Sequence, residues 1–469
     1  DWSSDVCSSD LQWLMNISLV GGWFPAAAFA VIAVLSVTLL VSAAVSKRDG
    51  RILATVLPIG VAAVSGMVGY VVAWLLSDVF VVFGVGLGSR VMAWVAAGFA
   101  IAGFAIVHIV LSRGMMRVAA AILTVFAILA AAIGIDQSYG EYATIGSLFG
   151  EDSYSQADLT GLAKRKDLIT VAQWRKQAAN GTIRNIPANG TVNKIDIPAT
   201  KSQFEARKAL VYLPPAALAD SKRKPALPVV LMLSGQPGSP GRVFQAGGIQ
   251  TMMDGYAKTH DGLAPIVIAA DQLGADSHNT LCVDSKVYGN ALTYLTQDVV
   301  DWVKTNLPAA QDAKDWAIAG FSQGATCSLQ IGVNHPDLFG TMIPTDSEIK
   351  PTNGSRQEMI DRFFDGDTTA YENQVPVNAI RNHAPTHQML IIGAGEKDTT
   401  SIRNVKTIAP VAAKAGMRVA AVESSGNAHD WHAVQDVLRY GLAVFGHDTG
   451  LDGANPNLSD YPNLKRITI

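Results

Sequence analysis

The chain has 469 residues, more than one ordinary domain holds, so its length favours at least two folded units. The formal net charge of −3 and the lack of a basic tract exclude the electrostatic pattern of a nucleic-acid-binding protein. Hydrophobic residues make up 49% of the chain and charged residues only 16%. The charge deficit lies between Ile17 and Ile135, and from about Glu151 onward the composition is that of a soluble protein. A membrane-embedded part followed by a soluble part is therefore expected.

The first eleven residues, DWSSDVCSSDL, resemble translated sequencing-adapter read-through. We therefore leave residues 1–11 out of the reasoning about the fold, as one leaves out a tag. Cys7 falls in this stretch, so Cys282 and Cys327 remain as the cysteines of the native protein.

Four apolar segments in residues 12–150 are each long enough to cross a bilayer, which takes about 20 residues. Because three further spans follow the first, the first does not read as a cleavable signal peptide. A linker over residues 151–190 and a soluble domain over 191–469 are expected to follow. The four expected spans are Trp23–Ser46, Ile52–Leu76, Val91–Leu111 and Val118–Ile135.

The charges in the loops orient these spans. The loops after the first and third spans are basic, whereas the loop after the second and the exit from the fourth are not. Positively charged loops stay in the cytoplasm, so both basic loops are expected inside. The sequence thus predicts a multi-pass protein of the cell membrane with its large C-terminal domain outside the cytoplasm. The basic residues are Lys47, Arg48, Arg51, Arg113 and Arg117.

From Thr191 onward, short β-rich runs alternate with helical stretches. This rhythm predicts an α/β fold, with a mostly parallel sheet covered by helices on both faces. The strands are expected at Val192–Ile197, Ala209–Leu213, Pro228–Leu233, Pro265–Ala270, Trp316–Ala319, Gly340–Pro344, Gln388–Ile392 and Arg418–Val422. The main helices are expected at Ala291–Asn306, Gly324–Asn334, Arg403–Ala415 and His432–Phe445.

The run Gly320-Phe321-Ser322-Gln323-Gly324 matches the G-x-S-x-G motif, between a predicted strand and an apolar helix. A nucleophile elbow requires this context, because the serine sits on a tight strand-to-helix turn where side chains at the flanking positions would collide. The alternative is an ordinary turn flanked by glycines. The motif points to Ser322 as a nucleophile and to the backbone N–H of Gln323 as one donor of an oxyanion hole.

A nucleophilic serine needs a base and an orienting acid, which follow it in the order acid, histidine in this fold. His429 is the candidate base because its loop lies between the last predicted strand and the last helix; His432 is the alternative. Glu396 and Asp398 both follow the penultimate strand, and either could orient the imidazole. We favour Asp398.

A second oxyanion donor is expected in the Ser234-Gly235-Gln236-Pro237-Gly238 turn, which follows an early strand. The backbone N–H of Gln236 is the candidate, and a plain Gly-Pro turn is the alternative. The spacing of histidines and cysteines gives no metal-ligand pattern, and this chemistry needs neither a metal nor another cofactor.

GFSQG, the Ser234-Gly235-Gln236 turn and the GNAHDW loop together resemble the putative-esterase family of α/β-hydrolases. That family includes esterase D–like hydrolases and the secreted mycolyltransferases of actinobacteria. The resemblance covers roughly Thr191–Phe445, and the four-span region is similar to that of multi-span actinobacterial membrane esterases. It implies an α/β-hydrolase fold with Ser322 as nucleophile, His429 as base and an acidic third member. Because the mycolyltransferases use a glutamate, Glu396 stays open.

The two remaining cysteines fit this picture. Cys327 is expected on the helix after the elbow and Cys282 in a loop at the same end of the sheet, so an outward-facing domain could join them in a disulfide. Two buried free thiols are the alternative. The expected function is a membrane-anchored serine esterase or acyltransferase that acts on acyl esters of envelope lipids. A catalytically inactive sensor or scaffold that keeps the hydrolase fold is the alternative.

Overall fold

The computed structural model describes residues 13–45, 51–80, 87–149, 154–162, 167–183 and 185–469. The chain divides into two compact units, Asp1–Glu151 and Asp152–Ile469. Residues 1–11, Cys7 and the basic positions Lys47 and Arg48 lie outside the described residues.

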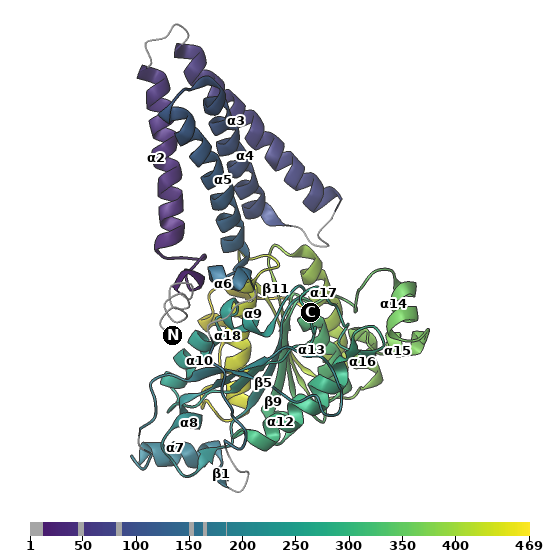
Figure 1. The fold of residues 1–469 in the computed structure, drawn as a ribbon. Helices are drawn as coiled ribbons and strands as arrows, with labels where there is room; N and C mark the ends of the chain where they lie inside the picture. The colour runs from purple at the N-terminus through teal and green to yellow at the C-terminus, as the bar shows by residue number, and fades with distance from the viewer. Residues whose placement is uncertain (1–12, 46–50, 81–86, 150–153, 163–166, 184) are drawn as a thin grey trace. The chain divides into compact units, whose positions relative to one another are not determined.

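Long apolar helices make up the described part of the first unit (Figure 1). All four expected spans are confirmed as helices, and each is long and apolar enough to cross a membrane. Helices α3 and α4 approach closely, since a Cβ added at Gly103 would lie 2.4 Å from the hydroxyl oxygen of Ser65. The helices are α2 (Trp23–Val45), α3 (Arg51–Trp74) with the π-helical continuation η1 (Leu75–Val79), α4 (Gly88–Leu111) and α5 (Met115–Tyr139), followed by α6 (Ile145–Leu148).

The segments that flank this helical region pair with each other. The N–H of Leu19 donates to the carbonyl oxygen of Ala143 at 3.0 Å, and the N–H of Ile145 donates to that of Ile17 at 3.0 Å. The chain that enters α2 and the chain that leaves α5 therefore lie at the same end of the unit. Helix α5 has 25 residues and is about 38 Å long, so the turn before it, with Arg113, lies at the other end.

A nine-stranded sheet forms the centre of the second unit in the described residues. Its spatial order is β13-β12-β11-β10-β9-β5-β6-β3-β2. Strands β5, β6 and β9 to β12 run parallel, whereas β2, β3 and β13 pair antiparallel, so the predicted mostly parallel sheet is confirmed. The strands are β2 (Thr191–Ile195), β3 (Ala209–Leu213), β5 (Val229–Leu233), β6 (Ile266–Ala269), β9 (Trp316–Phe321), β10 (Thr341–Thr345), β11 (Met389–Gly395), β12 (Arg418–Ser424) and β13 (Leu464–Arg466).

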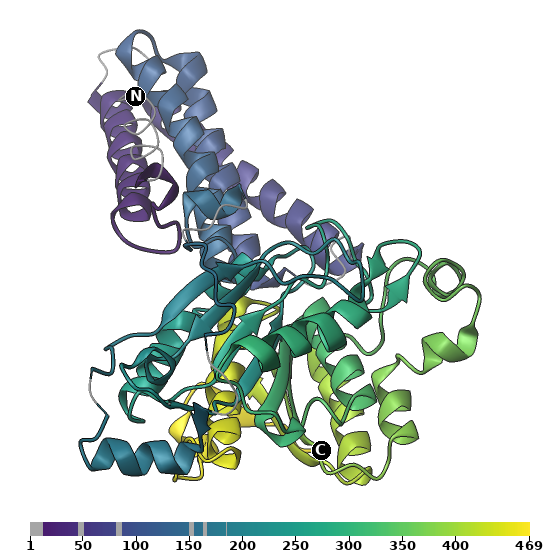
Figure 2. The same ribbon diagram turned by 60° about the horizontal axis from the view of Figure 1, so that its bottom comes forward.

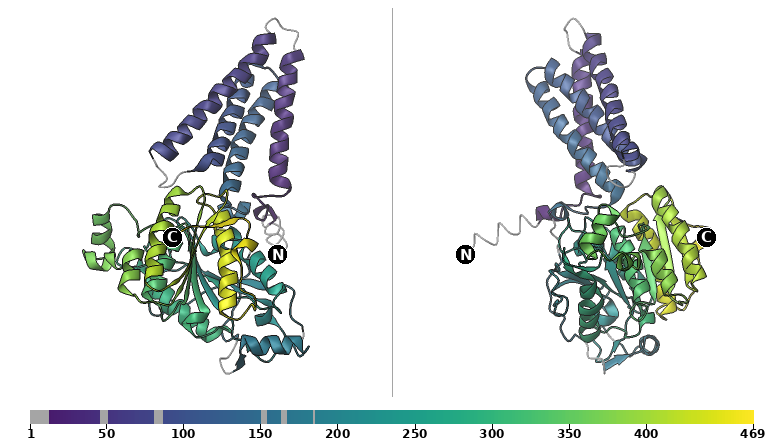
Figure 3. Two further views of the ribbon diagram at one scale, coloured as in Figure 1. Left: turned by 180° about the vertical axis from the view of Figure 1, so that it is seen from behind. Right: turned by 90° about the vertical axis from the view of Figure 1, so that its right-hand side faces the viewer.

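Helices cover both faces of the sheet (Figures 1 and 3). Leu231 of β5 packs in one core with α12 (Val299–Asn306), α13 (Gln323–Asn334) and α17 (Thr399–Lys414). Its neighbour Val230 packs in the other core with α9 (Pro240–Gln245), α10 (Ile249–Lys258) and α18 (Trp431–Asp448). Because both faces are buried, the strands read as continuous apolar runs, and each fully buried side chain of this size contributes about 1.5–3 kcal/mol.

Shorter elements fill the connections between these layers. They are β1 (Leu168–Ile169), α7 (Val171–Ala179), α8 (Pro215–Leu218), β4 (Lys224–Pro225), β7 (Asp284–Ser285), β8 (Gly289–Asn290), α11 (Ala291–Thr293), η3 (Tyr294–Asp298), η4 (Ala313–Asp315), α14 (Arg356–Phe363), α15 (Thr368–Glu372), α16 (Pro376–Asn382) and η5 (Leu458–Asp460).

Residues 151–190, where a linker was expected, carry secondary structure in the part that the structure describes. Strand β1 pairs with β4, and α7, the blue-teal helix at the lower left of Figure 2, belongs to the second unit. The side chain of Trp174 on α7 is fully buried in the core, and its indole N–H donates to the carbonyl oxygen of Asp261 at 3.1 Å. The segment is folded because its few apolar side chains complete a core whose other members lie far along the chain.

Candidate active site

Ser322 lies on a tight turn between β9 and α13. Its backbone has φ 55° and ψ −116°, a conformation that a non-glycine residue adopts only under strain. The turn is held by a hydrogen bond of 3.0 Å from the N–H of Ser322 to the carbonyl oxygen of Thr345, at the end of the neighbouring strand β10.

The two glycines of the motif are required by close backbone contacts. A Cβ added at Gly320 would lie 2.2 Å from the carbonyl oxygen of Gly324, and one added at Gly324 would lie 2.3 Å from that of Ser234. Real Cβ atoms do not approach so closely, so any side chain at either position would force the turn open. The predicted nucleophile elbow is thus present, with Gln323 as the first residue of α13.

The structure brings Ser322, His429 and Asp398 together in one hydrogen-bonded chain. Nε2 of His429 lies 2.8 Å from the hydroxyl oxygen of Ser322, and Nδ1 lies 2.7 Å from Oδ2 of Asp398. Asp398 caps α17 with its other oxygen, which accepts the N–H groups of Thr400 and Ser401 at 3.1 and 3.0 Å. The carboxylate is therefore fixed by the helix at the same time as it holds the imidazole.

The two alternative residues lie elsewhere. Glu396 accepts the N–H of Gly426 at 2.7 Å and forms an ion pair of 2.9 Å with Lys465, so its carboxylate is turned to the surface. His432 lies inside α18. The geometry thus pairs Asp398, and not Glu396, with His429.

The charges of this pair follow from their hydrogen bond. Burial alone would raise the pKa of Asp398 and lower that of His429. The bond between them and the attraction of opposite charges outweigh burial, so the pKa of Asp398 lies below its usual value and that of His429 above its own. An ionised Asp398 only accepts, so Nδ1 of His429 carries the proton. Nε2 of the neutral ring is then left to accept the hydroxyl proton of Ser322.

The turn after β5 lies directly against the elbow. A Cβ added at Gly235 would lie 3.6 Å from the Cβ of Ser322, which places the expected oxyanion turn beside the reacting oxygen. Gln236 is the next residue, and its side chain donates to the carbonyl oxygen of Ser277 at 3.4 Å. Arg207 supports the far end of the turn, because its guanidinium donates to the carbonyl oxygen of Gly238 at 2.9 Å.

Gln272 connects this turn to the elbow and was missed by the sequence reasoning. Its side-chain N–H donates to the carbonyl oxygen of Ser234 at 2.7 Å and to the side chain of Gln323 at 3.2 Å. The signal in the sequence was the position of Gln272 two residues after the expected strand Pro265–Ala270, since polar side chains gather where the strands of a parallel sheet end.

Cys282 and Cys327 are joined by a disulfide, as expected. Cys327 lies on α13, four residues after Gln323, whose side-chain amide lies 3.2 Å from its sulfur. The disulfide thus ties the loop that follows β6 to the helix that carries the candidate nucleophile.

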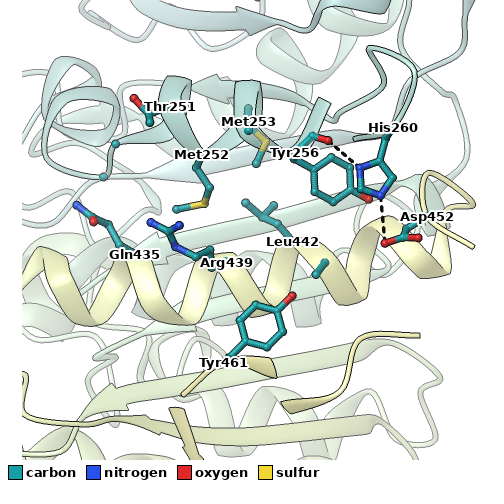
Figure 4. Close-up of a pocket in the computed structure, with 14 residues that line it drawn as sticks. Thr251, Met252, Met253, Tyr256, His260, Gln435, Arg439, Leu442, Asp452 and Tyr461 are labelled. Carbon is teal, nitrogen blue, oxygen red and sulfur yellow. Dashed lines mark hydrogen bonds and ion pairs between the residues drawn. The ribbon is translucent and has the colours of Figure 1, made fainter. Parts of the chain in front are cut away.

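A pocket of about 520 Å³ lies between α10 and α18 (Figure 4). Met252, Tyr256 and Tyr461 contribute to its wall, and His260 is fixed at one end by an ion pair of 3.2 Å with Asp452. The residues of the Ser322 chain do not line it. It is therefore separate from the candidate active site.

The fold and this site define an α/β-hydrolase with a serine, histidine and aspartate cluster on a nucleophile elbow. The family model described as "Putative esterase" matches residues 201–441, more than half of the chain. The chain therefore belongs to the Putative esterase family.

Individual proteins are similar to this chain as well. An uncharacterised protein of Corynebacterium glutamicum is 32% identical over 333 residues, which cover 69% of this chain and 74% of the relative. Among solved structures, an S-formylglutathione hydrolase from Agrobacterium tumefaciens is 16% identical with a TM-score of 0.46, covering 57% of this chain and 98% of that one. MPT51 (FbpC1) from Mycobacterium tuberculosis is 14% identical with a TM-score of 0.40, covering 55% of this chain and 98% of that one.

Proposed function

We propose that this protein is a membrane-anchored serine esterase or acyltransferase that works through an acyl-enzyme on Ser322. The observation that carries the proposal is the hydrogen-bonded chain from Ser322 through His429 to Asp398, on a strained elbow. This chain has the geometry that nucleophilic catalysis requires, since nucleophile and base lie within hydrogen-bond reach and a third group orients the base.

In the first half of the reaction, Nε2 of His429 takes the hydroxyl proton while the oxygen of Ser322 attacks the ester carbonyl carbon. A bond forms between these atoms, and the carbonyl oxygen becomes an oxyanion. When the intermediate collapses, the bond to the leaving alkoxide breaks, and His429 gives its proton to that oxygen. Asp398 stays ionised and stabilises the imidazolium in between.

The N–H groups of Gln323 and Gln236 are the proposed donors to the oxyanion. Gln323 begins α13, where the first N–H groups of the helix have no partner inside it and the helix dipole favours negative charge. The turn that carries Gln236 adjoins Ser322 through Gly235. Loss of one such donor costs about 3–4 kcal/mol of transition-state stabilisation.

In the second half, an acceptor completes the cycle. His429 removes a proton from water or an alcohol, the acceptor oxygen attacks the acyl carbon, and the oxygen of Ser322 leaves and regains the proton. With water the protein is an esterase, and with an alcohol it is an acyltransferase.

The proposed place of action is the outer side of the cell membrane. Arg113 and Arg117 lie at the end of the spans opposite to the exit of α5, which favours that exit outside the cytoplasm. The disulfide between Cys282 and Cys327 supports the same side, because disulfides persist in oxidising compartments. The proposed substrate is an acyl ester of an envelope lipid, since four membrane-spanning helices in the same chain would keep the catalytic unit at the bilayer.

Labelling of the full-length protein with a fluorophosphonate probe tests the proposal. The wild type is expected to be labelled and to hydrolyse a short soluble ester, and Ser322→Ala is expected to lose both, with about a millionfold loss in turnover. Ser328→Ala is the matched control, because this buried serine of α13 donates its hydroxyl to the carbonyl oxygen of Ala325 within the same helix. Unchanged activity in Ser322→Ala would refute the mechanism, and a wild type without labelling or hydrolysis would favour the inactive scaffold.

A further inference from the structure

A second carboxyl lies beside the pair of Asp398 and His429. Asp346 directly follows β10, has no exposed surface, and adopts a φ of 56°. Its N–H donates to the carbonyl oxygen of Gly393 at 2.9 Å, and its Oδ1 accepts the N–H of Gly395 at 2.9 Å. The end of β11 thus fixes both the backbone and one side-chain oxygen of this residue.

The carboxyl of Asp346 lies near the candidate active site, and one of its two oxygens has no hydrogen bond in the part of the chain that the structure describes. One ligand atom from each of Asp346, Asp398 and His429 lies within 4.8 Å of the other two. Oδ2 of Asp346 is buried and has no hydrogen-bond partner among the described residues. Unpaired buried polar atoms are costly and rare, so this arrangement calls for a role.

The surrounding charges bear on the protonation of Asp346. The groups that face it are His429, Asp398 and Asp430, and Glu348 lies near the same imidazole. Burial raises the pKa of Asp346 well above its usual value, and the neighbouring carboxylates act in the same direction. His429 acts in the opposite direction. Because two adjacent carboxylates do not readily ionise together, an ionised Asp398 favours the protonated form of Asp346.

Asp430 cannot serve His429 in the same way. Its Oδ1 accepts the N–H of Ala433 at 3.0 Å and caps α18, and its Oδ2 accepts the N–H of Ala428 at 2.7 Å in the preceding loop, so both oxygens already have partners. Asp346 keeps one oxygen free, and this difference distinguishes the two acids around the imidazole.

We propose that Asp346 is a second positioning residue for His429, able to take over the hydrogen bond to Nδ1 when Asp398 does not make it. The inference rests on the proposed function, because it requires His429 as the base. In taking over, Asp346 releases its proton to water, turns its free oxygen toward the ring and accepts a hydrogen bond from the Nδ1–H group, which keeps its proton. The bond from Gly395 holds the rest of the carboxyl in place.

A double-mutant cycle in the full-length protein tests this role. Asp398→Ser removes the carboxylate and opens space beside the ring, but keeps a hydroxyl that can cap α17. Asp346→Asn has the shape of the protonated acid, and asparagine tolerates positive φ. We expect Asp398→Ser to lower kcat/KM about a hundredfold, Asp346→Asn to lower it no more than about threefold, and the double variant to lose about ten-thousandfold.

The pH dependence of the Asp398→Ser variant gives a second readout that a structural role would not move. Its residual activity requires ionised Asp346, whose pKa burial raises. The acid limb of its kcat/KM profile is therefore expected at higher pH than that of the wild type, and this limb should vanish with Asp346→Asn. Glu348→Gln in the Asp398→Ser background is the matched control, because it neutralises a nearby acid outside the three-residue cluster and should leave the residual activity unchanged.

The outcomes separate this inference from the proposed function. If the double variant is as active as Asp398→Ser, Asp346 has no such role, although the Ser322 mechanism stands. If Glu348→Gln lowers the residual activity as much as Asp346→Asn does, the proposed role of Asp346 is also refuted. The loss would then follow from removing any nearby negative charge and not from a hydrogen bond to His429. Activity that survives Ser322→Ala would refute the proposed function itself. Equal thermal unfolding midpoints for Asp398→Ser and the double variant establish that their difference lies in catalysis.

Discussion

The side-chain amide of Gln323 donates a hydrogen bond of 3.2 Å to the sulfur of Cys327. The same amide lies 3.3 Å from the side-chain oxygen of Asn279, and the side-chain oxygen Oε1 of Gln323 accepts a hydrogen bond from the side chain of Gln272. The residue whose N–H we assign to the oxyanion hole is thereby packed between the disulfide and the loop that follows β6.

Removal of the disulfide should therefore affect both stability and catalysis. For Cys282→Ser combined with Cys327→Ser, we expect the free energy of unfolding to fall by about 3–4 kcal/mol, since the bridge closes a loop of 45 residues. We also expect kcat/KM to fall several-fold, because Gln323 loses a contact. Denaturant unfolding and ester hydrolysis measure the two effects. In the wild type, both cysteines should resist alkylation until they are reduced; alkylation of unreduced protein would contradict the bridge.

The two acids that follow β11 should differ in their effect on catalysis. Asp398→Asn is expected to lower turnover about ten-thousandfold, because an amide in place of the carboxylate favours the wrong tautomer of the imidazole. Glu396→Gln should change turnover little, since the carboxylate of Glu396 bonds to Gly426 and Lys465 at the surface and not to His429. Steady-state kinetics on a soluble ester compares the two variants. Small and equal losses would mean that the acid lies elsewhere.

In the pH profile of kcat/KM, the midpoint of the acid limb should lie above the usual pKa of a histidine side chain. His429 must be neutral to accept the proton of Ser322, so kcat/KM falls as the pH drops through the pKa of His429. Burial lowers this pKa, but the hydrogen bond with Asp398 and the negative charge of that carboxylate raise it above its usual value of 6.5. We expect the midpoint of the acid limb above about pH 6.5 in a kcat/KM profile. A midpoint below this value would show that burial dominates.

The orientation of the spans can be measured with reporters fused after Ile469. Since the basic loops favour the cytoplasm, alkaline phosphatase should be active in this position and a cytoplasmic fluorescent reporter should stay dark. Reporters fused in the turn at Arg113 should give the opposite result and serve as the control. The reverse pattern at both sites would overturn the proposed outward placement of the hydrolase unit.

The anchor should matter for lipid substrates and not for soluble ones. We expect the full-length protein to cleave long-chain acyl esters in vesicles at least tenfold faster than the hydrolase unit alone, expressed from Asp152, because association with the bilayer raises the local substrate concentration. Short soluble esters should be turned over equally by both forms, which also checks that the separate unit folds. Equal rates on vesicles would exclude a role for the anchor. Faster acyl transfer to added alcohols or sugars than to water would define a transferase.

Local patterns sufficed for much of the fold and for part of the candidate site. The four spans and the main strands were predicted within a few residues, because a continuous or periodic apolar run reports burial directly. Ser322 was found from its flanking glycines, and the chain order of the fold directed attention to His429 and Asp398. The same patterns left Glu396 and Asp398 as alternatives, because both follow the same strand within three residues.

Contacts between distant segments decided the rest. Only the folded chain shows that the Asp398 carboxylate meets His429 while Glu396 turns to Lys465. Asp346 and Gln272 carry no motif, and they reach the site because parallel strands β10 and β6 end at the same edge of the sheet as β9 and β11. Trp174 belongs to a core whose partners lie far away in sequence. The sequence by itself thus determined which segments are buried and where the turn that carries the candidate nucleophile lies, since both depend on residues close together along the chain. The tertiary structure alone decided which polar groups meet, because hydrogen bonds depend on distances that chain closure and packing set.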